Sequence, residues 1–529
     1  MNRLASSSRR LWVGLLLLLA IASWSIAARA DTSPVPPSAS TSASIQPYLD
    51  RVSDRITEFT LDNGLQFVVL KDNDAPIVSF VTYADVGAVD EEAGKTGAAH
   101  FLEHLAFKGT ERIGTTDRTA ERTAIARLDA LRDQLEAARA DGKTDETIAG
   151  LQGQFAAAQQ DADRAIDQNA YGRIIRIEGG LGLNAATSPD YTVYFCSLPA
   201  NKLELWMSLE SERFLEPVFR EFYKEQQVIL EERRQRTDDS PIGTLIESFL
   251  ARAFAVHPYG RPTIGFAEDI RNLRREDIRE FFARHYVPSK LTIAIAGDVD
   301  PVEVRHLAET YFGRFPARSA LADAIPEEPR QQELREFELG LPSQPLYLEG
   351  YHRPALTHPD EPVYEILADL LGSGRTSRLY KSLVVEQQVA LSVQTDNAFP
   401  GNRYPSLMLF YGASAPGRTL DELEAALTAE LDLLKTEPVA AEELARVKTQ
   451  VRASLLRSLD SPAGMARQLA EYQAKTGDWR NLFARVEQLA AVTPEDVQRI
   501  ARATFVPENR TVGRLLSVDA PDAERPAES

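Results

Sequence analysis

Two histidines and a glutamate lie within five residues in the segment His100-Phe101-Leu102-Glu103-His104. On an α-helix, residues three and four positions apart share a face, so both imidazoles can reach one metal ion. Zinc favours nitrogen and carboxylate ligands of this kind. It lowers the pKa of a bound water to about 7, and a carboxylate at position 103 can then take the proton. The segment predicts one Zn²⁺ per chain, with His100 and His104 as ligands and Glu103 as the general base.

The order of these residues is the inverted form, His-x-x-Glu-His, of the commoner helix motif His-Glu-x-x-His. The alternative interpretation is a pair of surface histidines that happen to be close. Only 7 histidines occur among the 529 residues. Ordinary residue frequencies would place this motif by chance in on the order of one per cent of such chains. The motif therefore favours a metal centre.

A zinc centre with two histidines needs a third ligand and an open coordination position. Glutamates at 225, 231 and 232 are the candidates. Glu225 and Glu232 are two helical turns apart and share one face, so one can bind zinc while the other orients it. The alternative is a solvated acidic helix face. Spacing alone does not choose between Glu231 and Glu232.

Beyond these residues, the chain resembles the inverted-zincin metallopeptidases of the insulinase, pitrilysin and mitochondrial-processing-peptidase family. The resemblance covers nearly the whole chain after the N-terminal region and is interrupted at 117–168. In length the chain is similar to the two-domain branch of processing-peptidase type. The segments that carry the resemblance are 60–65, 99–110, 184–194, 228–232, 257–265, 297–298 and 372–380.

The resemblance implies an α+β protein with two related α+β domains that form a clam-like chamber. It also implies a zinc endopeptidase that hydrolyses peptides or unfolded protein segments. The family's register selects Glu232 as the third ligand and Glu225 as its partner in the second shell. The strand at Asn184 and Ala185 would bind the substrate backbone as an added strand.

One departure from the family concerns an Arg and a Tyr, seven residues apart, that usually hold the substrate carbonyl. The aligned positions fall on Val384 and Leu391, whose side chains cannot donate a hydrogen bond. Stabilisation of the oxyanion is normally a large catalytic term. We therefore expect a paralogous subunit that carries the pair, or a homo-oligomer. The alternatives are a non-catalytic structural or binding subunit of the same fold, or an export-associated clamp.

The first thirty residues carry the features of a secretory signal peptide. Three arginines precede an apolar, uncharged stretch from Leu11 to Ala28, and Ala28-Arg29-Ala30 supplies a small-x-small cleavage pattern. We expect cleavage near Ala30 and a periplasmic or secreted location. An uncleaved membrane anchor is the alternative, and no later segment of the sequence is long and apolar enough to span a bilayer.

The rest of the chain mixes predicted strands and helices and contains an internal repeat. A helix, a Val-Pro corner and a strand at 276–296 recur at 495–515, with a constant offset of 219 residues. The repeat predicts two related α+β halves. Residues 117–168 show helical spacing around a central Asp-Gly and predict a helical hairpin, either a solvated arm or a partner-docking arm. The expected organisation is a signal peptide at 1–30, a flexible tether at 31–52, a zinc-binding peptidase domain at 53–316 with the insert at 117–168, a linker at 317–333, and a C-terminal peptidase-like domain without the zinc motif at 334–520.

The composition excludes two classes. A net charge of −19 and a pI of about 5.0 disfavour nucleic-acid binding, because the phosphate backbone would repel the chain. Removal of residues 1–30, which hold four arginines and no acid, would make the charge −23. The single cysteine, Cys196, excludes an internal disulfide framework. Core packing and the metal centre must therefore stabilise the fold.

Overall fold

The computed structural model describes residues 46–215, 217–318 and 324–518. The predicted signal peptide, its cleavage site and residues 31–45 of the predicted tether lie outside the described residues. The prediction of a flexible tether is wrong for residues 46–52, because they belong to helix α2 (Gln46–Ser53), which buries Leu49 and Val52. From Leu49 onward the described residues form one compact unit. None of the helices in the described ranges is both long enough and apolar enough to cross a membrane.

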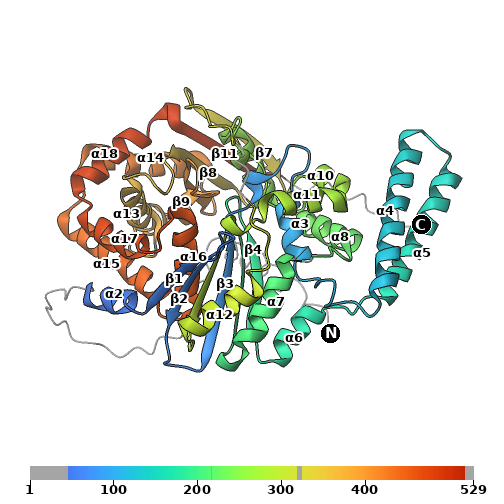
Figure 1. The fold of residues 1–529 in the computed structure, drawn as a ribbon. Helices are drawn as coiled ribbons and strands as arrows, with labels where there is room; N and C mark the ends of the chain where they lie inside the picture. Colours follow the sequence, from blue (N-terminus) through green and yellow to red (C-terminus); the bar gives the residue numbers. More distant parts are fainter. Residues whose placement is uncertain (1–45, 216, 319–323, 519–529) are drawn as a thin grey trace, which may run out of the picture. The chain divides into compact units, whose positions relative to one another are not determined.

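The first sheet has six strands in the order β1-β2-β6-β3-β5-β4 (Figure 1). Asp62-Asn63-Gly64 turns the chain between β1 and β2, and Gly64 adopts a left-handed φ of +97° that glycine tolerates without strain. The buried central strands form the middle of the N-terminal core. The strands are β1 (Ile56–Thr60), β2 (Gln66–Lys71), β3 (Ile77–Ala84), β4 (Leu181–Thr187), β5 (Thr192–Pro199) and β6 (Leu291–Gly297).

The second sheet, in the order β7-β11-β8-β10-β9, repeats the first without an equivalent of β1. In both sheets one parallel pair, β2–β6 or β7–β11, is followed by antiparallel pairs. The predicted repeat is confirmed, since α11 (Arg275–His285) leads to β6 as α18 (Pro494–Thr504) leads to β11. The strands are β7 (Arg335–Leu341), β8 (Leu346–Arg353), β9 (Ala390–Phe399), β10 (Ser406–Ser414) and β11 (Arg510–Ser517).

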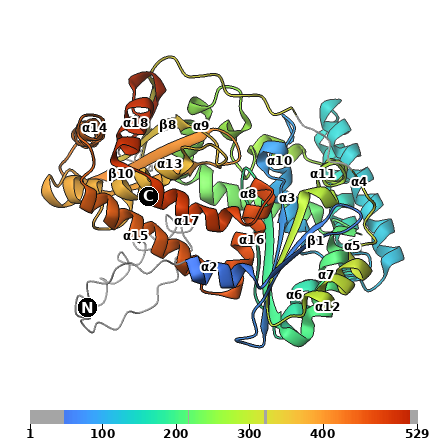
Figure 2. The same cartoon turned by 60° about the vertical axis from the view of Figure 1, so that its left-hand side comes forward.

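Helices pack around the two sheets, and the segment predicted as a hairpin forms α4 and α5, which lie side by side (Figures 1 and 2). The remaining helices are α2 (Gln46–Ser53), α3 (Ala98–Leu105), α4 (Arg118–Ala140), α5 (Asp145–Arg164), α6 (Ala170–Ile177), α7 (Leu203–Leu215), α8 (Phe222–Arg233), α9 (Pro241–Ala253), α10 (Ala267–Asn272), α12 (Pro301–Tyr311), α13 (Glu361–Gly372), α14 (Leu420–Thr436), α15 (Ala441–Ser458), α16 (Pro462–Thr476) and α17 (Asn481–Ala491).

The two halves of the chain exchange helices. α9, from the first half, buries Leu245 and Phe249 against β8, β10 and β11 of the second sheet. α16, from the second half, packs on β3 and β6 of the first sheet and buries Leu469. Each sheet is therefore packed against a helix from the other half of the chain.

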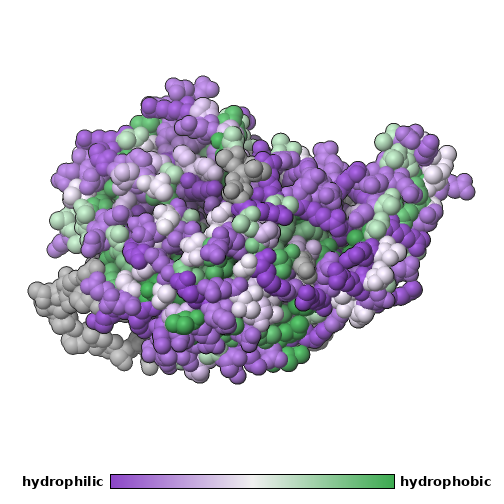
Figure 3. Space-filling view, in the orientation of Figure 1, coloured by the Kyte–Doolittle hydropathy of each residue, from purple (hydrophilic) through white to green (hydrophobic). Residues whose placement is uncertain are grey.

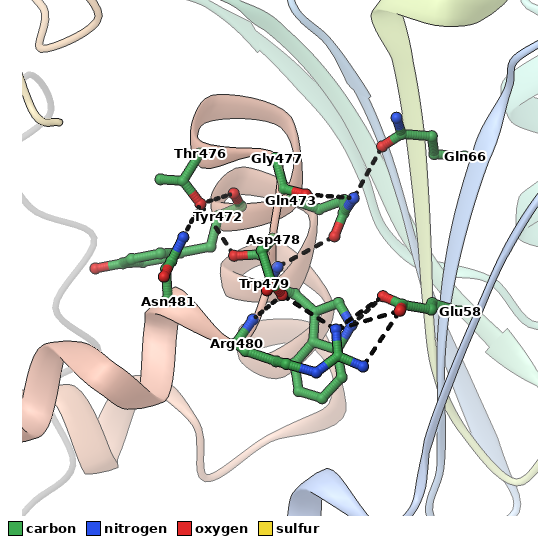
Figure 4. A network of polar contacts seen from close by, with 10 residues as sticks. All are labelled: Glu58, Gln66, Tyr472, Gln473, Thr476, Gly477, Asp478, Trp479, Arg480 and Asn481. Atoms are coloured by element: carbon green, nitrogen blue, oxygen red, sulfur yellow. Dashed lines mark hydrogen bonds and ion pairs between the residues drawn. The ribbon is translucent and has the colours of Figure 1, made fainter.

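The turn between α16 and α17 is tied to the edge of the first sheet (Figure 4). The indole Nε1 of Trp479 donates to Oε2 of Glu58 on β1 at 2.7 Å, and Arg480 pairs with the same carboxylate. Gln473 donates to Gln66 on β2 at 3.0 Å. These contacts join segments more than 400 residues apart in the sequence.

Candidate metal centre

The helix α3, which carries the His-x-x-Glu-His motif, begins at a buried carboxylate. Gly97 precedes the helix with a φ of +91°, and a Cβ there would lie 2.7 Å from the carbonyl oxygen of Ile264. Both oxygens of Glu91 accept hydrogen bonds, from the amides of Gly97 at 3.0 Å and Ala99 at 2.9 Å. Two of the unpaired donors at the helix start are thereby satisfied. Burial raises the pKa of Glu91 to about 8.

His100, His104 and Glu232 converge at one point between α3 and α8. Nε2 of His100 lies 3.8 Å from Oε1 of Glu232, and Nε2 of His104 lies 3.5 Å from Oε2. The three ligand atoms lie within 4.8 Å of one another. Zinc bonds of about 2.0–2.1 Å at tetrahedral angles require ligand atoms about 3.3 Å apart. Two imidazoles and a carboxylate at this spacing fit a zinc ion.

The protonation of the three side chains follows from their mutual contacts. Burial lowers the pKa of His100 to about 4. Burial alone would lower the pKa of His104, but hydrogen bonds to Glu225 and Glu232 raise it to about 9. Burial opposes ionisation of Glu232, yet the hydrogen bond to His104 and the charges of His100 and Arg236 lower its pKa to about 2. Glu232 is therefore ionised at neutral pH, and its negative charge attracts a cation to the cluster.

The structure separates the two adjacent glutamates that spacing left open. The side chain of Glu231 is 51% exposed and binds Arg234. The side chain of Glu232 is 19% exposed and faces both histidines. The α-helical twist of about 100° per residue puts neighbours on different faces, so only Glu232 reaches the centre.

Glu225 lies against a histidine of the cluster. Its Oε2 is 3.2 Å from Nδ1 of His104, and its Oε1 is 2.6 Å from Nζ of Lys108. The sequence led us to expect Glu225 as the partner of Glu232, but its hydrogen bond goes to His104. A hydrogen bond at Nδ1 sets the tautomer and orientation of the ring and leaves Nε2 free for a metal.

Glu103 points to the strand β4. Oγ1 of Thr187, at the end of β4, donates to Oε2 of Glu103 at 2.5 Å. Burial raises the pKa of Glu103 above its ordinary value. A carboxylate with a raised pKa, held beside a metal centre, is suited to accept and pass on a proton.

The strand β4 is the edge of the first sheet, next to β5. Asn184 is exposed and Ala185 is buried, as expected for alternate residues of an edge strand. The surface around α6, which precedes this strand, carries apolar residues on a largely hydrophilic face (Figure 3). A pocket of about 440 Å³ beside β4 is lined by Phe107, Asn169, Gly172, Ile175, Arg176, Gly180, Leu183 and Asn184.

The two positions where the resemblance implied an Arg and a Tyr lie in the second half of the chain. Val384 is half-buried and packs against the C-terminal core. Leu391 lies near the start of β9 with 55% of its surface exposed. Neither contributes a donor to the cluster of α3 and α8.

Three further side chains complete the surroundings of the cluster, and sequence reasoning gave them no role. Thr187 binds Glu103, Lys108 binds Glu225, and Arg236 pairs with Oε1 of Glu232 at 2.6 Å. Thr187 and Lys108 occur in the segments that carry the family resemblance, which is the signal that could have found them. Arg236 is four residues after Glu232, the spacing of a helical ion pair.

Two family models match this chain. The model of the insulinase (peptidase family M16) domain matches residues 67–125 and 165–266. The model described as the peptidase M16 inactive domain matches residues 272–451. The first match contains both helices of the cluster and the first turns of α4, and it skips residues 126–164, which form the rest of the hairpin α4–α5.

Similar proteins come from distant organisms. The zinc protease PqqE of Helicobacter pylori is 29% identical over 455 residues, which cover 84% of this chain and 89% of that protein. A probable mitochondrial-processing peptidase subunit beta of Arabidopsis thaliana is 24% identical, over 91% of this chain and 82% of that one. The crystal structure of a protease from Helicobacter pylori has a TM-score of 0.72 and 27% identity, and the match covers 87% of this chain and 99% of that one. The chain therefore belongs to the insulinase family, peptidase family M16; it has two related α+β halves and carries an inverted His-x-x-Glu-His motif on α3.

Proposed function

We propose that this protein is an exported zinc-dependent endopeptidase that hydrolyses peptides or unfolded protein segments. The observation that carries the proposal is the convergence of His100, His104 and Glu232, with Glu103 on the same helix turn. Relatives named zinc proteases support the same chemistry. One Zn²⁺ bound at the three side chains would supply a Lewis acid that activates water and polarises the substrate carbonyl.

The other residues have distinct roles in this proposal. Glu103 takes a proton at its carboxylate and delivers it to the leaving amine, and the hydroxyl of Thr187 holds that carboxylate in place. Glu225 orients the ring of His104. Asn184 and Ala185 present the open edge of β4 to an extended peptide, which adds as a strand.

Metal analysis and peptide hydrolysis test the catalytic assignment. Glu103→Gln should keep zinc and lose about 10²–10⁴-fold in kcat, since a positioned general base contributes that much. Glu232→Gln should lose zinc. The matched control is Glu231→Gln on the same helix, whose side chain binds Arg234 away from the cluster. Full hydrolysis by the Glu103→Gln protein would refute the assignment.

We also propose that a second subunit completes the active site. Val384 and Leu391 offer no hydrogen-bond donor at the positions where the family resemblance leads us to expect an Arg and a Tyr. A paralogue with that pair, or a second copy of this chain, would supply other donors. Hydrolysis should rise when the zinc-loaded chain is mixed with such a paralogue. Full activity of the isolated chain as a monomer would rule out this requirement.

A non-catalytic subunit is the second candidate, and the absent Arg/Tyr pair is the observation that favours it. The two candidates differ in one measurement. A non-catalytic subunit would hydrolyse no peptide even with zinc and the paralogue present.

Export is part of the proposal. The sequence pattern of residues 1–30 supports a signal peptide that is cleaved near Ala30. N-terminal sequencing of the protein recovered from the periplasm or the medium should begin at or near Asp31. A chain that stays in the membrane fraction with an intact N-terminus would instead indicate an anchor.

A further inference from the structure

The first turn of the inserted hairpin places a carboxylate in the interior of the N-terminal half. Glu121 lies in the first turn of α4, and its side chain is 3% exposed. Its two oxygens accept hydrogen bonds from Nε and Nη2 of Arg220, at 2.6 and 3.2 Å. The side chain of Arg220 is 1% exposed. Removal of one partner from such a pair leaves an uncompensated buried charge, so the two side chains are needed together.

The guanidinium of Arg220 also binds the loop that follows α3. Nη1 donates to the carbonyl oxygens of Lys108 at 2.5 Å and Ile113 at 2.7 Å. Nη2 donates to the carbonyl oxygen of Thr110 at 2.7 Å. One side chain therefore fixes three backbone positions of this loop and joins them to α4.

The backbone on both sides is shaped around this guanidinium. Gly109 and Gly114 adopt φ values of +89° and +91°, and a Cβ at either would lie 2.9 or 2.8 Å from Nη1 of Arg220. Phe219 and Glu221, which flank Arg220, also adopt left-handed φ values of +55° and +57°. Residues other than glycine adopt such values only where the surroundings hold them.

The loop leads directly to the metal cluster. Nζ of Lys108 lies 2.6 Å from Oε1 of Glu225 and 3.3 Å from Oε2 of Glu221. The other oxygen of Glu225 is 3.2 Å from Nδ1 of His104. Arg220 thus holds the carbonyl group of Lys108. The ammonium group of Lys108 contacts the carboxylate of Glu225, which in turn orients His104, a predicted zinc ligand.

We propose that Glu121 and Arg220 are positioning residues for the zinc centre. Through them the inserted hairpin holds the chain of contacts from Lys108 to Glu225 to His104. The hairpin is then a support of the metal site in addition to a solvated arm. This inference rests on the proposed function, because it needs zinc at the predicted ligands.

Zinc affinity of the full chain tests the inference independently of hydrolysis. The zinc dissociation constant is measured by competition with a chromophoric chelator for the wild type, Glu121→Gln, Lys108→Met and the double variant. Each single variant should bind zinc about tenfold more weakly, as is typical for the loss of outer-shell support. The double variant should bind no more weakly than Lys108→Met alone, because both changes act through the same contacts.

A matched control separates positioning from general destabilisation. Glu361 on α13 is also a buried carboxylate paired with arginines, Arg353 and Arg485, in the second half of the chain. Glu361→Gln should lower the thermal midpoint and leave the zinc dissociation constant unchanged. If Glu121→Gln does not fold, Glu121→Asp replaces it in the same comparison.

Two results would overturn the inference alone: an unchanged zinc dissociation constant for Glu121→Gln, or an additive effect in the double variant. A wild-type chain that binds no zinc would overturn the proposed function itself. The two failures are therefore distinguishable.

Discussion

At the scale of single residues, the hydroxyl of Thr187 is a side-chain donor that holds the carboxylate of Glu103. Oγ1 of Thr187 donates to Oε2 of Glu103 at 2.5 Å, across the gap between β4 and α3. The bond holds the carboxylate in one orientation beside the histidines. The bond should contribute about 1.5–3 kcal/mol of free energy, as other hydrogen bonds to charged groups do.

Thr187→Val should therefore lower kcat for peptide hydrolysis about tenfold, because tenfold in rate corresponds to about 1.4 kcal/mol. Zinc content should stay at the wild-type level, since Thr187 contacts no predicted ligand. Thr187→Ser keeps the hydroxyl and should keep most of the activity. An unchanged kcat for the valine variant would show that Glu103 does not depend on this bond.

Another residue-scale effect concerns His257, which is 5% exposed and packs against Tyr404 with 5.0 Å between ring centroids. Its Nδ1 accepts a hydrogen bond from the amide of Tyr259 at 3.1 Å. Burial lowers the pKa of His257 to about 4, from an ordinary value near 6.5. Between those values the unfolded chain binds a proton that the folded chain does not, so acidification favours unfolding.

The loss of folding stability caused by the lowered pKa of His257 should be absent above about pH 6.5 and should amount to about 2–3 kcal/mol near pH 4. His257→Asn removes the titration and keeps an acceptor for the amide. Urea unfolding at pH 7 and pH 4.5 should show a smaller acid-induced loss for this variant than for the wild type. Equal losses in both proteins would mean that His257 is already protonated in the fold.

At the scale of elements, the position of α3 depends on how its first turn is capped. Both oxygens of Glu91 bind amides of that turn, and Glu91 is 5% exposed. Truncation would leave two buried donors without partners, each at a cost of about 1–3 kcal/mol. The cap therefore stabilises the helix that carries two predicted ligands and the predicted base.

Glu91→Ala should reduce the free energy of unfolding by about 2–6 kcal/mol, measured by urea denaturation. The neighbouring Glu92→Ala is the control, because its side chain is 58% exposed and only forms surface ion pairs. It should change the free energy by less than about 1 kcal/mol. Similar effects of both substitutions would argue against the capping role.

The elements also show why local patterns predicted so much of this fold. The helices α3 and α8 and the repeat that ends in β6 and β11 occur where residue spacing predicted them. These signals are local, since a strand or helix leaves its period in its own residues. The base of the inserted hairpin is different, because nothing in the sequence near Glu121 indicates that its partner is Arg220.

At the scale of the whole molecule, segments from the two ends of the compact unit bind each other. Trp479 is 2% exposed, and its Nε1 donates to Glu58 at 2.7 Å (Figure 4). Loss of this acceptor would leave a buried indole N–H without a partner. The surface pair of Arg480 with the same carboxylate adds little, because exposed ion pairs contribute about 0–1 kcal/mol.

Glu58→Ala should lower the local opening free energy of the α16–α17 turn by about 1–2 kcal/mol. Hydrogen exchange of the amides near residue 479 should then be about five- to thirtyfold faster in the limit of fast reclosing. Amides of β10 in the second sheet serve as an internal reference and should not change. Unchanged exchange near residue 479 would show that other contacts hold the turn.

Some features of the whole molecule have no counterpart in local sequence patterns. The exchange of α9 and α16 between the sheets depends on the packing of surfaces that are far apart in the chain. The choice of Glu232 over Glu231 depends on which face of α8 meets α3, and the pairing of Glu225 with His104 depends on the same contact. Long-range packing of this kind follows from the whole fold and leaves no periodic signal.

The sequence by itself predicted the residues of a zinc site and the fold class: the inverted motif on one helix, a set of candidate glutamates, the α+β repeat and the absent hydrogen-bond donors at Val384 and Leu391. Those properties depend on residue type and on spacing along the chain, and a helix or strand preserves that spacing in the folded protein. Spacing left Glu231 and Glu232 open, and the tertiary structure turns Glu232 toward the histidines, pairs Thr187 with Glu103 and Lys108 with Glu225, and pairs the buried Glu121 with Arg220. Each of these is a contact between segments distant in sequence, and only the packing of helices on sheets brings them within bonding distance.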